Sequence, residues 1–281
     1  MNSPIVGEGQ ALHRGFLPPV TGRTRIYGIL ADPIYHVKTP EVMNALLTSR
    51  GVDGVLVPFH VKPDGLKTLV DGLRRMENFG GFIATVPHKT DMLALCDEVT
   101  GAARNIGAVN CVRREADGRM VGAMLDGIGF VEALRVANAD PAGMSVYLAG
   151  AGGASSAIAF ALAEAGVVHI TVANRTIERA KGLTERLRAA YPALTVDTDA
   201  DRIANHDLVV NGTSLGMRLN DEPPLDLSRL RGDQLVADAI MEPAMTPLLK
   251  AAEAKGCRIF PGKPMLESQI VLMAQHMGAL A

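Results

Sequence analysis

Along the first third of this chain, continuous apolar runs alternate with segments whose apolar residues recur at helical spacing. Apolar runs such as "TRIYGIL" (24–30) and "GVLVPFHV" (54–61) predict strands, because they are rich in β-branched and aromatic residues. The segments "TPEVMNALLTSR" (39–50) and "PDGLKTLVDGLRRM" (63–76) carry apolar residues at helical spacing. Strand and helix signals in this order predict βαβ units and a largely parallel sheet.

The next segment places a cation where a helix is expected to begin. "GGFIATV" (80–86) predicts a third strand, and the proline after it suits the first position of a helix with Lys89 in its first turn. The positive end of a helix dipole opposes a cation there, so Lys89 needs another reason to be present. "GAVNCVRREADGRMVGAM" (107–124) then predicts a hairpin with arms of about six residues. A helix follows, which Asp126 or Gly127 can cap.

A second series of the same kind begins at residue 144. Strands are predicted by "MSVYLAG" (144–150), "VHITVANR" (168–175), "DLVVNGT" (207–213), "QLVADAI" (234–240) and the short "CRIF" (257–260), with helical patterns between or after them. The last segment, "PMLESQIVLMAQHMGALA", predicts a closing helix with an apolar stripe. The chain is therefore expected to have an α/β fold of two domains.

Composition narrows the class of protein. A length of 281 residues, with 48% hydrophobic and 21% charged residues, is typical of a soluble protein of about two domains. A net charge of −2 and 4% aromatic residues disfavour a nucleic-acid surface, and no apolar stretch suits a bilayer span. Cys96, Cys111 and Cys257 are far apart and the histidines show no ligand spacing, so we expect a cytoplasmic protein without disulfides or a metal site. His88 is read as a cap or a surface residue.

The segment "YLAGAGGASSAIAFALAEAG" has the pattern with the clearest physical explanation, that of a dinucleotide-binding turn. A strand runs directly into Gly150, Gly152 and Gly153, and a helix of small residues follows. In a dinucleotide site the first glycine permits a tight turn and the second lets the backbone approach a pyrophosphate. Ala154 or Ser155 then takes the position where only a small side chain allows close packing of helix on strand. A purely structural turn is the alternative.

The end of the following strand indicates which dinucleotide binds. An NAD site places an acidic residue there, about 20 residues on, to hold the ribose hydroxyls. This chain has Asn174 instead, followed by Arg175, Thr176 and Arg179. Charge-assisted contacts to a 2′-phosphate are worth about 1.5 to 3 kcal/mol each, so the segment favours NADP. The alternative is a solvated helix start that happens to be basic.

Several motifs occur together in one order: "VPHK", "GAVN", "GAGGAS", "NRTIERA", "DAIMEPAMTPLL" and "PMLESQ". In this the chain resembles the shikimate dehydrogenase family over residues 25–281. The resemblance implies an NADP-dependent oxidoreductase of aromatic amino acid and chorismate biosynthesis, and it allows a homodimer. It implies a mostly parallel α/β substrate and catalytic domain over 23–126 joined by the closing helix over 262–281, and a Rossmann NADP domain over 127–261. Residues 1–22, with glycines and prolines and few apolar residues, predict a flexible extension.

The resemblance also assigns roles to residues. Lys89 matches the family's catalytic lysine, which donates a proton when a ring ketone is reduced, and Asp126 matches its partner aspartate. An exposed surface lysine and a simple helix cap are the alternatives. The substrate side is implied at Thr39, Val37, Thr85, Asn110 and Gln269. The cofactor side is implied at Gly150, Gly152, Gly153, Ala154, Asn174, Arg175, Thr176, Arg179 and Thr213.

Four positions depart from the family pattern, because apolar residues stand where the family has polar ones: Val37, Ile83, Met124 and Met241. Val37 replaces one of two hydroxyls that hold the substrate carboxylate, and each lost hydrogen bond to a charged group costs about 1.5 to 3 kcal/mol. We therefore expect a shifted substrate, unless His36 or Lys38 replaces the lost contacts. A quinate-type NAD enzyme and a non-catalytic nucleotide sensor remain as alternative functions.

Overall fold

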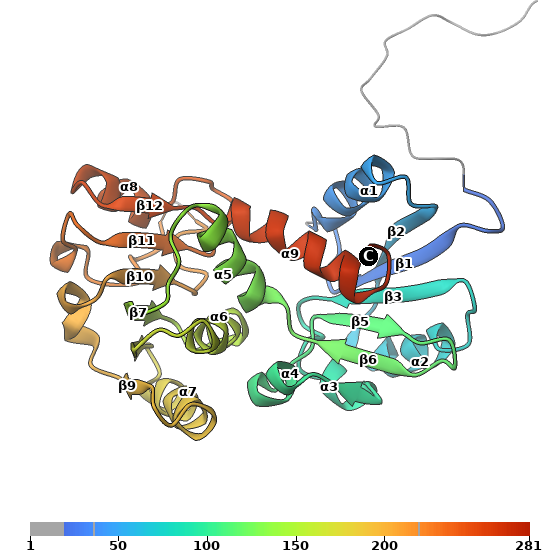
Figure 1. Ribbon diagram of the computed structural model, residues 1–281, viewed down its shortest axis with the longest axis horizontal. Coiled ribbons are helices and arrows are strands. Elements are labelled where there is room, and N and C mark those ends of the chain that lie inside the picture. Colours follow the sequence, from blue (N-terminus) through green and yellow to red (C-terminus); the bar gives the residue numbers. More distant parts are fainter. Residues whose placement is uncertain (1–19, 36, 219) are drawn as a thin grey trace, which may run out of the picture.

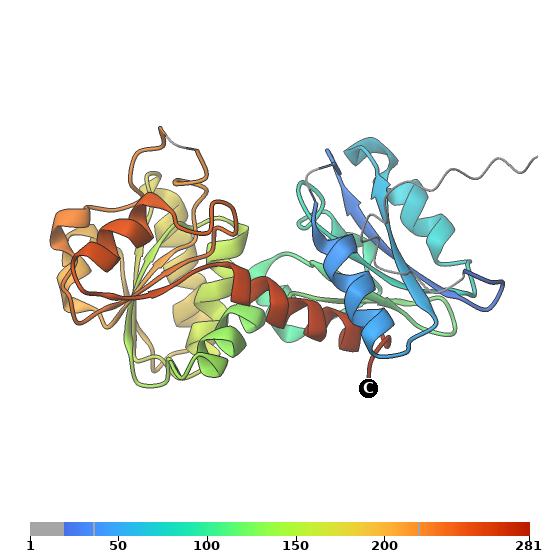
Figure 2. The same ribbon diagram turned by 90° about the horizontal axis from the view of Figure 1, so that it is seen from above.

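The computed structural model describes residues 20–35, 37–218 and 220–281. Two six-stranded sheets lie at opposite ends of an elongated molecule, with helices α5 (Asp126–Val136) and α9 (Lys263–His276) between them (Figure 1; Figure 2). We call the part built on strands β1 to β6 the first lobe and the part built on β7 to β12 the second lobe. The predicted extension lies outside the described residues as far as residue 19, and so does His36.

The sheet of the first lobe is mixed, in the order β2-β1-β3-β5-β6-β4. Strand β1 pairs in parallel with β2 and β3, as predicted, and β4 pairs in parallel with β6. The predicted hairpin of β5 and β6 is confirmed, although its arms have 4 residues each and β5 is antiparallel to β3. The elements are β1 Arg25–Ala31, α1 Thr39–Ser49, β2 Gly54–His60, α2 Pro63–Leu73, β3 Phe79–Ala84, α3 Met92–Leu95, β4 Glu98–Val99, α4 Gly101–Ile106, β5 Cys111–Arg114 and β6 Met120–Ala123.

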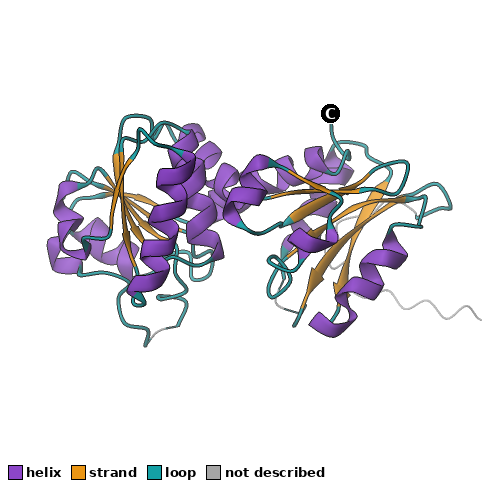
Figure 3. Cartoon of the chain, turned by 90° about the horizontal axis from the view of Figure 1, so that it is seen from below, coloured by secondary structure: helices purple, strands orange, loops and turns teal. Residues whose placement is uncertain are grey.

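The sheet of the second lobe is wholly parallel, in the order β12-β11-β10-β7-β8-β9. Its order reverses between β7 and β10, which is the Rossmann arrangement, and helices cover both faces (Figure 3). The elements are α5 Asp126–Val136, β7 Ser145–Ala149, α6 Gly153–Glu164, β8 His169–Ala173, α7 Ile177–Ala190, β9 Thr195–Asp197, η1 Ala200–Asn205, β10 Leu208–Asn211, η2 Leu227–Arg229, β11 Leu235–Asp238, α8 Pro247–Ala254, β12 Arg258–Phe260 and α9 Lys263–His276.

Two glycines at the start of α5 bring three helices together between the lobes. A Cβ atom on Gly127 would lie 2.0 Å from the carbonyl oxygen of Ala157 in α6. A Cβ atom on Gly129 would lie 2.8 Å from the Cβ of Gln269 in α9. Only glycine permits approaches this close. Helix α9 thus leaves the second lobe, crosses α5 and packs against α1 and β5 of the first lobe (Figure 1).

The segment that carries Lys89 is not the helix that the sequence predicts. Residues 86–91 form successive turns, and helix α3 begins only at Met92. The carbonyl oxygen of Lys89 accepts a hydrogen bond from the Val109 amide at 2.8 Å. This carbonyl is therefore bonded to the segment before β5 instead of to a helical amide. The predicted helix start was therefore wrong, because Lys89 lies in a turn three residues before α3 begins.

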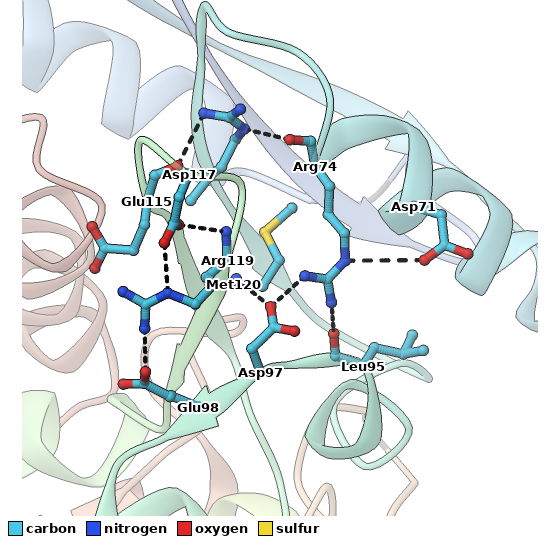
Figure 4. A network of polar contacts seen from close by, with 10 residues as sticks. Asp71, Arg74, Leu95, Asp97, Glu98, Glu115, Asp117, Arg119 and Met120 are labelled. Atoms are coloured by element: carbon cyan, nitrogen blue, oxygen red, sulfur yellow. Dashed lines mark hydrogen bonds and ion pairs between the residues drawn. The ribbon is translucent and has the colours of Figure 1, made fainter.

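The short strand β4 depends on ion pairs at the edge of the first lobe rather than on an apolar pattern. The carboxylate of Asp97 accepts from the Met120 amide at 2.7 Å and from Arg74, which also donates to the Leu95 carbonyl oxygen at 2.6 Å (Figure 4). Arg119 pairs with Glu98 of this strand (Figure 4). A two-residue strand held in this way has no sequence period that predicts it.

Candidate active site

An ion pair joins the turn after β3 to the start of α5. Lys89 Nζ donates to Asp126 Oδ2 at 2.7 Å, and the two side chains are 25% and 8% exposed. Leu125 is the N-cap of α5 and Asp126 is its first residue, and the contacts of the Asp126 carboxylate within the described residues are with other side chains. The predicted pair therefore forms, and the cap alternative for the Asp126 side chain does not hold.

The other oxygen of Asp126 is held by two amides. Asn110 Nδ2 donates to Asp126 Oδ1 at 2.5 Å, and Gln269 Nε2 of α9 donates to the same oxygen. Asn110 is completely buried, and its own Oδ1 accepts from the Leu125 amide at 2.8 Å. We call Lys89, Asp126, Asn110 and Gln269 the polar quartet. Because four separate segments supply its members, the folded chain orients Asp126 before any ligand arrives.

Backbone contacts fix the turn that presents Lys89. The Thr85 amide donates to the Leu30 carbonyl oxygen of β1 at 3.0 Å, and the His88 amide donates to the Thr85 carbonyl oxygen at 2.8 Å. His88 is buried and its Nε2 lies 2.9 Å from the Val61 carbonyl oxygen, so the expectation of a cap or surface residue was wrong. The Thr85 hydroxyl makes no hydrogen bond within the described residues and can serve a ligand.

The apolar departures from the family pattern occupy different environments. Ile83 and Met124 are 3% and 1% exposed and belong to two different apolar cores, whereas Met241 is 49% exposed. Val37, just before α1 and Thr39, is partly buried against the same core as Ile83. The Lys38 side chain is 74% exposed and lies 3.9 Å from Glu41. Val37 is thus an apolar position at a partly accessible edge, whereas Ile83 and Met124 serve packing.

The glycine turn after β7 has the shape that a pyrophosphate requires. Gly150 has φ +113°, and a Cβ atom there would lie 2.4 Å from Ser155 Oγ. Ser155 is completely buried and donates to the Gly212 carbonyl oxygen at 2.8 Å, so it rather than Ala154 takes the close-packing position. A Cβ atom on Gly152 or Gly153 would meet nothing within 4 Å. The start of α6 is therefore open to a ligand, and its amides suit an anion.

Two arginines, Arg175 and Arg179, follow β8. Asn174 Nδ2 donates to the Thr176 carbonyl oxygen at 2.9 Å, which orders the loop before α7. Arg175 and Arg179 are exposed, and neither guanidinium forms a hydrogen bond or ion pair with a residue in the described ranges. Thr213, just after β10, donates from Oγ1 to Asn211 Oδ1 at 2.7 Å. The residues present fit NADP, because free guanidinium groups lie where a 2′-phosphate is expected.

Residues 20–35, 37–218 and 220–281 contain neither a cluster of metal-binding side chains nor a helix that could span a membrane. No group of three or more His, Cys, Asp or Glu side chains there is arranged to hold a metal ion. No helix in that part of the chain is long and apolar enough to cross a bilayer.

A Rossmann sheet with an open glycine turn, next to a lobe that presents a lysine and aspartate pair, defines a two-domain oxidoreductase. Family models for "shikimate dehydrogenase substrate binding domain" and "shikimate / quinate 5-dehydrogenase" match residues 29–112 and 133–221. The chain belongs to the shikimate dehydrogenase family.

Three relatives show the range of the resemblance. Shikimate dehydrogenase (NADP(+)) of Rubrobacter xylanophilus is 40% identical over 254 residues, which cover 89% of each chain. Shikimate 5-dehydrogenase of Thermus thermophilus, solved with NADP(H) and shikimate, has a TM-score of 0.82 at 32% identity and covers 92% of this chain and 94% of its own. The 5-ketofructose reductase of a Gluconobacter strain has a TM-score of 0.83 at 33% identity, with 91% and 93% covered.

Sequence reasoning brought the right residues together in part. Lys89 and Asp126 are in contact, as the resemblance implied. Asn110 and Gln269, which the resemblance assigned to the substrate, also contact Asp126. Buried His88 was misread, because a single histidine beside a turn carries no burial signal. Its position directly after a predicted buried strand was the one available hint.

Proposed function

We propose that this chain is an NADP-dependent oxidoreductase that interconverts a ring alcohol and the corresponding ketone. The observation that carries the proposal is the 2.7 Å contact between Lys89 Nζ and Asp126 Oδ2, with Asp126 held from its other side by Asn110 and Gln269. The names of the curated relatives support NADP as the cofactor and shikimate as the first substrate to test.

The polar quartet accounts for the proton part of the reaction. The bound cofactor would supply the hydride as NADPH in reduction and would accept it as NADP+ in oxidation. In reduction, the Lys89 ammonium donates a proton to the ketone oxygen as that oxygen gains negative charge, and in oxidation the neutral amine takes the proton from the alcohol. Asp126 orients the ammonium toward the substrate and stabilises its charge. Asn110 and Gln269 keep the carboxylate from turning away.

The two lobes divide the work in this proposal. Residues 23–126 with the closing segment 262–281 bind the substrate, through Thr39, Val37 and Thr85 as well as the quartet. Residues 127–261 bind NADP. The glycine turn receives the pyrophosphate at the start of α6, Thr213 lies near the carboxyl end of β10, and Arg175 and Arg179 contact the 2′-phosphate.

A second candidate substrate is a cyclic ketone without a carboxylate. Val37 supports it, because this side chain packs against an apolar core and has no hydroxyl to hold a carboxylate. The neighbouring cation, Lys38, is 74% exposed. A family relative named for the reduction of 5-ketofructose shares the fold of 91% of this chain, so a substrate of that class lies within the range of the architecture.

Initial rates for a small panel of substrates test the proposal. The panel is shikimate and quinate for oxidation and 5-ketofructose for reduction, each with NADP(H) and with NAD(H). We expect turnover of one of them with NADP(H), lost in Lys89→Ala and kept in Lys67→Ala, whose lysine pairs with Asp71 on the exposed face of α2. NADP binding without turnover of any of the three would favour the nucleotide sensor, and a preference for quinate with NAD would favour a quinate-type enzyme.

A further inference from the structure

Arg186 joins the two lobes at a point away from the polar quartet. It belongs to α7 of the second lobe, and its Nη1 donates to the carbonyl oxygens of Ile106 at 3.0 Å and Asn105 at 3.4 Å. Both carbonyls are in the last turn of α4, in the first lobe. The final carbonyls of a helix carry partial negative charge and have no partner within the helix, so a guanidinium is a suitable donor for them.

The surroundings of Arg186 indicate that hydrogen bonds hold this junction. Its Nη2 lies 3.4 Å from Ser156 Oγ, and its central carbon lies 6.0 Å from the centre of the Phe160 ring in α6. No carboxylate of the described residues pairs with it. A cavity of about 440 Å³ borders the same side chain, with Asn105 and Tyr191 among its lining residues. Helix α4 also packs on α6, and Ile106 shares an apolar core with Phe160, so Arg186 adds a polar link between the end of α4 and α7.

The carbonyls that Arg186 binds lie directly before the segment that supports Lys89. Helix α4 ends at Ile106, and its C-cap Gly107, with φ +77°, turns the chain. The Val109 amide then donates to the Lys89 carbonyl oxygen at 2.8 Å, and Asn110 Nδ2 donates to Asp126 at 2.5 Å. A displacement of the α4 end is therefore transmitted to both members of the ion pair.

At its other end, α7 carries the residues proposed to hold the cofactor. The helix begins at Ile177, and Arg179 lies in its first turn. Arg186 follows Arg179 by seven positions, about two helical turns, so the two arginines project from the same side of one helix. Helix α7 thus connects the expected 2′-phosphate contact to the α4 junction.

We propose that Arg186 is a positioning residue, which sets Lys89 and Asp126 in the right place relative to the NADP-binding lobe. The proposal rests on the proposed function for its kinetic consequence. Its structural part, that Arg186 holds the segment of Val109, is independent of any activity.

The first test compares Arg186→Gln with Arg188→Gln. Arg188 lies on the same helix but donates to the Val196 carbonyl oxygen, within the second lobe, at 2.6 Å. For Arg186→Gln we expect kcat to fall by about 10- to 100-fold, the loss that follows when reacting groups are slightly misplaced, while the dissociation constant for NADP changes by less than about 3-fold. Arg186→Lys restores part of kcat, because an ammonium can still donate to the α4 carbonyls. Arg188→Gln keeps both values.

The second test is hydrogen exchange of the Val109 amide in the protein without substrate. We expect exchange to be about 10-fold faster in Arg186→Gln than in wild type or Arg188→Gln, because the bond to Lys89 opens more often. An unchanged exchange rate at Val109, or a kcat within twofold of wild type, overturns the proposal. If Lys89→Ala keeps full activity, the proposed function fails instead, and the exchange result alone decides on Arg186.

Discussion

The two ends of the proposed active site differ in how much of their charge is already satisfied. The carboxylate of Asp126 has contacts from Lys89, Asn110 and Gln269 and is 8% exposed. Arg175 and Arg179 are exposed, and their guanidinium groups contact no charged partner within the described residues. Groups that move a proton gain from being oriented beforehand, whereas groups that recognise an anion keep their donors free for it.

The largest effect should come from removing the charge of Asp126. Asp126→Asn keeps the shape of the side chain but leaves the Lys89 ammonium without its carboxylate. We expect kcat to fall by about 10³-fold, within the range of general acid–base contributions, with NADP affinity unchanged. Steady-state kinetics and a fluorescence titration with NADPH measure the two quantities. A parallel loss of cofactor affinity would mean that the two ends are not separate, contrary to the comparison.

The next effect should come from the free arginines. Replacing both Arg175 and Arg179 by glutamine removes two charge-assisted contacts of about 1.5 to 3 kcal/mol each, so NADP affinity should fall by about 10²-fold or more. NAD affinity should stay within about threefold, because NAD has no 2′-phosphate. Calorimetric titrations with each cofactor check this. Equal losses for NADP and NAD would show that these side chains are a solvated basic surface.

A smaller effect is expected from one amide of the polar quartet. Gln269→Ala leaves Asp126 Oδ1 with only Asn110 as a side-chain donor, so kcat should fall by about 10-fold. The matched control is Gln275→Ala on the same helix, since the Gln275 side chain donates to the Ala281 carbonyl oxygen at 3.3 Å and does not contact Asp126 within the described residues. Both variants are assayed at saturating substrate and cofactor. Equal rates in the two variants would show that the hydrogen bond from Gln269 to Asp126 does not contribute to kcat.

The smallest effect concerns the pH dependence of the free energy of unfolding, to which a buried histidine of the second lobe and one of α9 contribute. Burial lowers the pKa of His206 in the second lobe and of His276 in α9, which packs on the first lobe, below the ordinary value of 6.5. The unfolded chain therefore binds more protons than the folded chain as pH falls below 6.5. The stabilisation is complete above that value and is lost as pH falls through the folded pKa of each histidine.

Urea unfolding at about pH 7.5 and pH 5 measures this dependence. We expect a lower free energy of unfolding at the acidic pH, and a smaller difference in His206→Gln, which cannot be protonated. The same difference in wild type and variant would exclude His206 as a source of the pH dependence.

Much of the fold follows from local patterns in the sequence. Apolar runs predicted the strands of both sheets except the short β4 and β9, and the glycine pattern predicted the turn at Gly150. The helix expected at Lys89 failed because its carbonyl bonds to Val109, which no local pattern shows. Arg186 gave no signal either, since its partners are backbone carbonyls of a distant helix.

Only those parts of the site that charged residues and family motifs indicate could be predicted from the sequence. Lys89 and Asp126 could be paired from the resemblance, but the burial of Ile83 and Met124 in the cores depends on packing between segments far apart in sequence. Of the four apolar departures, partly buried Val37 and Met241, which is 49% exposed, are the two whose side chains are accessible to a ligand.

The most direct measurement is the single-turnover rate of Lys89→Met with saturating NADPH and the ketone that the wild type turns over. Methionine matches the lysine stem in length but holds no proton to give. We predict a rate at least about 10³-fold below wild type, with the dissociation constant for NADPH unchanged. A rate within threefold of wild type would contradict the claim that Lys89, held by Asp126, delivers the proton.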